Sequence, residues 1–103
     1  MGVHRVTSEA ARAYVRREKV LGNAISVLGR ASTKLEELDK ETLEKCGDLA
    51  CSLLPHAPGY AGKLMLIISR LFWSAAGIEE KEGGSLPIEE IESQVKLLEN
   101  ALE

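Results

Sequence analysis

Apolar residues recur every three or four positions along most of this chain, the spacing of one face of a helix. In the first segment they gather on one side of a helical projection, and Thr7 or Ser8 is suited to cap the helix. We expect this helix to reach Gly29 or beyond. A break near Gly29 is the alternative, because Thr33 and Glu36 fit a capping box that would restart a helix. The apolar side comprises Val6, Ala10, Ala13, Tyr14, Val20, Leu21, Ala24, Ile25 and Leu28.

A second helix is predicted to begin at Lys40 and to stop before Pro55. Asp39 is its expected N-cap, and Leu38 and Leu43 occupy the positions of a hydrophobic staple. One apolar arc follows, formed by Leu43, Cys46, Leu49, Ala50, Leu53 and Leu54.

The third predicted helix, from about Tyr60 to Ala76, is the most apolar element and follows a turn at residues 55–59. Gly77 suits the residue just past its end. A helix that is apolar on most sides is expected to be buried on most sides. Its one polar strip consists of Lys63, Arg70 and Ser74.

Residues 79–85 form an acidic, glycine-containing connector, and a last helix is expected to open around Pro87. Its apolar residues alternate three and four apart over two heptads, the spacing of a coiled-coil seam. These residues are Ile88, Ile91, Val95, Leu98 and Leu102.

These patterns predict an all-α fold for residues 1–103. We expect one domain, a compact bundle of four to five helices that are mostly antiparallel because the joins are short. Low aromatic content, 4% of residues, implies a core made mostly of aliphatic side chains.

Location and redox state follow from the apolar runs and the cysteines. The first twenty residues hold five basic groups and no secretory signal, and no apolar run approaches the length of a membrane span. We therefore expect a cytoplasmic protein without a membrane partner. On one helix, Cys46 and Cys51 would point about 140° apart. Reduced thiols are expected, with Cys46 in the core and Cys51 on its flank.

Charge is divided along the chain. Residues 1–34 carry seven Lys or Arg and two acids, a net of +5, whereas the remainder carries six basic and fourteen acidic residues, a net of −8. Five of the cations align on one helix face and form a candidate phosphate-binding surface, which we call the basic stripe. It pairs with the acids of residues 36–48 or it faces outward. The basic stripe consists of Arg5, Arg12, Arg16, Lys19 and Arg30.

Arg17 projects from the apolar side of the first helix, away from the basic stripe. Three arrangements suit a cation there: a side chain that reaches back to water, a pair within the chain, or a salt bridge to a partner.

Catalytic and metal-binding motifs find little support. Cys46, Cys51 and His56 are five and five apart, wider than zinc ligands usually stand, and no fourth ligand accompanies them. An enzyme centred on His56 would need a pocket at the 55–59 turn with another titratable group beside it. We expect no metal, no cofactor and no enzymatic activity.

The remaining signal is apolar surface in excess of what a small bundle buries. We expect a non-enzymatic interaction module or complex subunit that self-associates or binds a protein partner. The alternatives are a nucleic-acid-binding subunit that uses the basic stripe, or a last helix that folds over the third and closes a monomer. The candidate interface residues are Arg17, Leu66, Trp73, Ile91, Val95 and Leu98.

Overall fold

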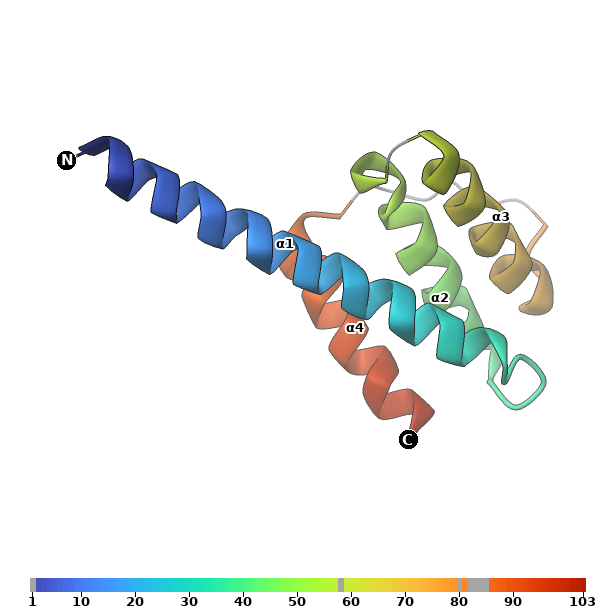
Figure 1. Ribbon diagram of the computed structural model, residues 1–103. Helices are drawn as coiled ribbons and strands as arrows, with labels where there is room; N and C mark the ends of the chain where they lie inside the picture. Colours follow the sequence, from blue (N-terminus) through green and yellow to red (C-terminus); the bar gives the residue numbers. More distant parts are fainter. Residues whose placement is uncertain (1, 58, 80, 82–85) are drawn as a thin grey trace.

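The computed structural model describes residues 2–57, 59–79, 81 and 86–103, with side chains described from residue 8 onward. Every regular element in these ranges is a helix, which confirms the all-α class. They are α1 (Gly2–Ser32), α2 (Lys40–Ser52), the 3₁₀ helix η1 (Leu54–His56), α3 (Gly59–Ala75) and α4 (Ile88–Leu102) (Figure 1). The mostly antiparallel order of the helices stays a prediction.

Helix α2 occupies the middle of the fold. It packs against α3 on one side, and it also contacts α1 and α4, which cross each other (Figure 1). Phe72 of α3, Leu49 of α2 and Ile91 of α4 are fully buried. The core therefore draws its apolar side chains from all four α-helices.

The N-terminal part of α1 projects beyond the other helices (Figure 1). Helix α1 has 31 residues, about 46 Å at 1.5 Å per residue, whereas α4 beside it has 15. Every side chain from residue 8 to residue 19 is exposed, and Val20 is the first to be buried. We call residues 8–19 the N-terminal arm.

The local signals of the sequence were partly correct. Helix α1 begins at Gly2, so the expected cap at Thr7 or Ser8 was wrong and both residues lie within the helix. It continues through Gly29, and the predicted capping box at Thr33 forms turns rather than a new helix. Asp39 caps α2 as predicted, because its Oδ1 accepts a 2.8 Å hydrogen bond from the Thr42 amide. This bond also lowers the pKa of Asp39.

The end of α3 is a Schellman motif. Gly77 has a φ of +79°, the left-handed conformation that favours glycine. The amide of Ile78 donates to the Trp73 carbonyl at 2.8 Å, and the amide of Gly77 donates to the Ser74 carbonyl at 3.0 Å. The helix therefore ends where the sequence predicted.

Helices α2 and α3 approach closely at Gly47. The Ser69 hydroxyl is fully buried and donates a 2.9 Å hydrogen bond to the Gly47 carbonyl. The Trp73 indole covers Gly47 one turn further along α3. Ser69, a polar residue, thus lies on the buried side of α3, where the sequence predicted only apolar side chains.

Helix α4 does not lie over α3, which was one of the alternative arrangements suggested by the sequence. It packs on α1 and α2 rather than folding over α3. Pro87 is its N-cap residue and precedes the first turn. Four of the five residues with heptad spacing are buried, and Ile88 is half-buried.

Candidate interaction surfaces

The four members of the basic stripe whose side chains the structure describes face outward. Arg12, Arg16 and Lys19 lie on the exposed N-terminal arm and line a surface hollow of about 500 Å³, together with Glu92 of α4. Glu92 contacts Arg16 at 3.6 Å. Arg30 is also exposed, about three turns from the nearest of these residues along α1, and the side chain of Arg5 lies outside the described part of the chain. Three cations therefore converge on one hollow with one carboxylate among them.

The acids of α2 interact elsewhere. The Lys81 ammonium group donates to Glu44 at 2.8 Å and to Asp48 at 3.0 Å, and Lys45 pairs with Glu41 at 3.3 Å. The bond to Lys81 lowers the pKa of Glu44, and the bond to Glu44 raises the pKa of Lys81. The described ion pairs of these acids are thus with lysines outside the basic stripe.

Arg17 makes a contact within the chain. Its side chain is exposed, and one guanidinium nitrogen lies 3.1 Å from Nδ1 of His56 in η1. Because arginine has no acceptor, the guanidinium group donates this bond and Nδ1 accepts it. The N-terminal arm is thereby tied to η1 at its inner end.

A row of large apolar side chains lies uncovered on α3. Tyr60 is 86% exposed and Ile67 64%. Leu64 and Leu71 complete the row at 46% and 47% exposure, which gives spacings of four, three and four residues. We call these four residues the α3 stripe. It lies on the side of the helix opposite to the residues that pack on α2.

The sequence pattern alone did not reveal the α3 stripe. Its spacing is the same as that of a buried helix face, and the apolar character of α3 predicted burial on most sides. Among the expected interface residues of α3, Leu66 is at the edge of exposure, 36%, and is separated from the stripe by Lys63 and Arg70 on the helix surface.

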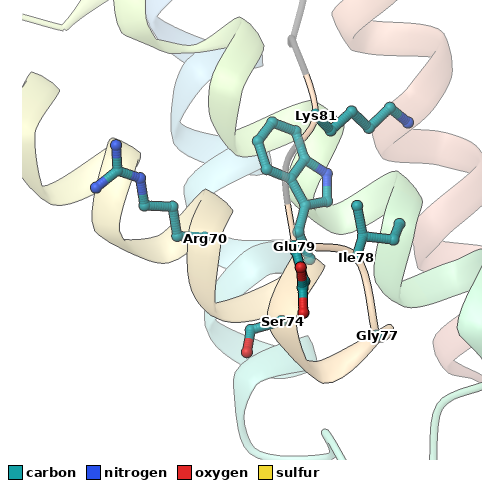
Figure 2. A pocket seen from close by; sticks show the side chains of 7 residues that line it. Arg70, Ser74, Gly77, Ile78, Glu79 and Lys81 are labelled. Carbon is teal, nitrogen blue, oxygen red and sulfur yellow. The ribbon is translucent and has the colours of Figure 1, made fainter.

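Trp73 is a core residue rather than an interface residue, because its side chain is 6% exposed. Its indole Nε1 donates to Asp48 at 3.1 Å. The ring borders an open hollow of about 970 Å³ at the end of α3. Arg70 and Lys81 extend in opposite directions from this hollow (Figure 2), so its two cations do not converge on a common point.

The expected interface on α4 also requires correction. Its proposed contact residues are 0 to 3% exposed, because they pack against α1 and α2 in the chain's own core. A side chain buried in this way is not accessible to a partner. These residues are Ile91, Val95 and Leu98.

Neither a metal site at Cys46, Cys51 and His56 nor a pocket at His56 is found among the described residues. No group of three or more His, Cys, Asp or Glu residues there is placed to hold a metal ion. Neither hollow is lined by His56 among its described residues. Cys46 and Cys51 are thiols, buried and half-buried respectively, and burial raises the pKa of Cys46 to about 11.

None of the helices in the described ranges combines the length and apolar character needed to cross a bilayer.

Fold and surface together define a small all-helical protein with an exposed basic stripe and an exposed apolar stripe. No protein-family model matches the chain, and no solved structure matches it. It is 57% identical over 102 residues to an uncharacterized protein of Archaeoglobus fulgidus, an alignment that covers 99% of this chain and 94% of that protein. The chain therefore belongs to the same family as this archaeal protein.

Proposed function

We propose that this protein is a non-enzymatic, cytoplasmic interaction module, a small subunit of a larger assembly. The observation that carries the proposal is the α3 stripe, in which Tyr60, Leu64, Ile67 and Leu71 are uncovered at heptad spacing. Scattered exposed apolar residues are common on proteins, but an aligned row forms a contiguous patch of the kind that marks interaction sites.

The N-terminal arm supports the same proposal. Its described side chains are all exposed, with Tyr14 and Val15 more than 60% accessible. Arg16 and Arg17 nevertheless contact side chains of α4 and η1, respectively. A helix end whose side chains stay exposed gains little from packing, so it is stabilised mainly when something else covers it.

A differential co-purification experiment tests the proposal. The tagged full chain, Leu64→Ser/Ile67→Ser and the control Leu97→Ser are each recovered from cells that contain the natural partners. Leu97 is a matched control because it is an exposed leucine, 53% accessible, on α4. We expect a discrete protein, or a second copy of the chain, to be retained by wild type and Leu97→Ser and lost from the double variant. A chain that sediments as a monomer and retains nothing specific would contradict the proposal.

Nucleic-acid binding is the second candidate, favoured by the convergence of Arg12, Arg16 and Lys19 on one exposed hollow. If these three cations each neutralise a phosphate, affinity should fall about 20- to 40-fold between about 50 and 200 mM salt. Fluorescence anisotropy with labelled RNA and duplex DNA measures this dependence.

Charge reversal supplies the control for that measurement. Arg12→Glu/Arg16→Glu should abolish binding, whereas Lys40→Glu/Lys96→Glu, with the same change in net charge at two exposed sites elsewhere, should weaken it only slightly. Equal losses in the two variants would show that net charge alone is responsible and would exclude the basic stripe as a site.

A further inference from the structure

We propose that the α3 stripe docks an amphipathic helix of a different protein, one whose apolar seam is flanked by acidic residues. This inference rests on the proposed interaction function and specifies the partner. It is argued from the spacing of the stripe, the charges beside it and the cost of pairing it with itself.

The spacing of the stripe fits a helix as its occupant. Tyr60, Leu64, Ile67 and Leu71 occupy alternating a and d positions of a heptad. Side chains at these positions pack into the spaces between four residues of a facing helix. The opposite side of α3, with Met65, Ser69 and Phe72 among its buried residues, is already held by the core, so the stripe is presented on a fixed support.

The charges beside the stripe are positive. Lys63 and Arg70 are exposed, seven residues apart, and both flank the stripe on the same side. Helix α3 contains no acidic residue. Glu79 follows the helix and shares the hollow beside Arg70, whereas Glu44 on α2 is bonded to Lys81. A partner helix with carboxylates beside its seam would therefore complement this flank.

A second copy of the chain fits the stripe poorly. In an antiparallel pair of α3 helices with Leu64 of one copy against Ile67 of the other, Lys63 of one copy approaches Arg70 of the other. Like charges at such flanking positions oppose association and help to determine which helices pair. Because α3 supplies no acid in either orientation, self-pairing leaves these cations uncompensated.

A membrane surface is the other occupant that cations and apolar residues together suggest. Interfacial helices carry a broad apolar face together with a strongly basic polar face. The α3 stripe is one side chain wide with two cations on one flank, and the rest of the helix circumference is largely occupied by the core. The geometry favours a helical partner.

Two synthetic peptides of about three heptads test the proposal. Both carry Ile and Leu at a and d; one carries Glu at e and g, and the other carries Lys. Mutual repulsion keeps each peptide from pairing with itself. Binding to the full-length protein is measured by fluorescence anisotropy at low salt. We expect the Glu peptide to bind at least about fivefold more tightly than the Lys peptide, since several charge pairs of modest strength contribute.

Variants of the protein locate the binding site. Leu64→Ser/Ile67→Ser should abolish binding of the Glu peptide, whereas Leu97→Ser should leave it unchanged. Lys63→Glu/Arg70→Glu should reverse the preference between the two peptides. All four residues changed on α3 are exposed, so circular dichroism spectra and melting temperatures should stay close to wild type.

Other outcomes would contradict the acidic helical partner without by themselves contradicting the proposed interaction function. Equal binding of the two peptides would contradict the proposal that the partner is acidic. If neither peptide bound, the proposal that the partner is a helix would be contradicted. Binding to phosphatidylserine vesicles in place of the peptides would assign the stripe to a membrane. A dimer in sedimentation that dissociates in the Leu64→Ser/Ile67→Ser variant would assign it to a second copy, and the interaction function would then stand.

Discussion

The indole ring of Trp73 lies so close to Gly47 that a Cβ atom at residue 47 would overlap the ring. The Ser69 hydroxyl bonds to the carbonyl of the same glycine. These two contacts together hold α2 and α3 close to each other at Gly47. The Trp73 indole also donates a hydrogen bond to the Asp48 carboxylate on α2. The support beneath the α3 stripe therefore depends on the absence of a side chain at residue 47.

Gly47→Ala should leave the protein less stable than the control variant Gly22→Ala. Both substitutions gain helix propensity, about 1 kcal/mol. At Gly22 no atom lies within 4 Å of an added Cβ, whereas at Gly47 the added methyl group displaces a buried ring. Overpacking of this kind costs about 1–3 kcal/mol. Urea denaturation should show Gly47→Ala less stable than Gly22→Ala by at least about 1 kcal/mol. Equal stabilities would contradict the close contact.

Leu98 and its neighbour Leu97 distinguish core from surface on α4. Leu98 is 1% exposed and Leu97 is 53% exposed. Truncation of a buried leucine costs about 2–5 kcal/mol. Leu98→Ala should therefore lower the free energy of unfolding by that amount, whereas Leu97→Ala should change it by less than about 0.5 kcal/mol. If the two variants were equally stable, α4 would not be part of the core.

The bond between Lys81 and Glu44 should be visible in the titration of the carboxyl group. The pKa of Glu44 is lowered in the folded protein by the hydrogen bond to Lys81, so the bond stabilises the fold above the ordinary carboxyl pKa. This contribution is lost as the pH falls through the lowered pKa of Glu44. In Lys81→Met the pKa of Glu44, followed by carboxyl-carbon NMR, should rise toward its ordinary value.

Lys81→Arg is the control for that titration, because it keeps a cation within reach of the carboxylate. The pKa of Glu44 should stay low in this variant. An unchanged pKa in Lys81→Met would show that the bond is not formed in solution.

The two thiols should differ in reactivity. Burial raises the pKa of Cys46 to about 11, and the thiolate is the nucleophile, so this side chain should be inert near neutral pH. Maleimide labelling of native protein followed by mass spectrometry should modify the half-buried Cys51 before Cys46. Cys46 should react only after denaturation. Cys51→Ser would then leave a native protein that resists labelling, and rapid labelling of that variant would contradict the burial of Cys46.

Local signals in the sequence predicted most of the helices correctly. The Asp39 cap, the Gly77 terminus and the apolar arc of α2 depend on residues within a few positions of one another, and their short-range geometry is largely set by residue type. The break considered near Gly29 was absent, because a glycine in a helix costs only about 1 kcal/mol and α1 continues through it.

Candidate surfaces were harder to predict, because periodicity marks an apolar face without saying what covers it. The seam of α4 and the stripe of α3 have the same spacing of three and four residues. The structure buries Ile91 and Val95 of the former and leaves Leu64 and Ile67 of the latter exposed. Likewise, the alignment of the basic stripe was visible in the sequence, but its separation from the α2 acids depended on how α1 lies against α4.

The sequence by itself determined that this chain is helical, that Asp39 caps α2 and Gly77 ends α3, and that Arg12, Arg16 and Lys19 share a face. These properties arise from bonds and spacings within single segments. Only the tertiary structure decided which apolar faces meet, because burial depends on the neighbours that each helix finds. Helix α4 covers α1 and α2 and leaves one side of α3 open, and this arrangement places the proposed docking surface on α3.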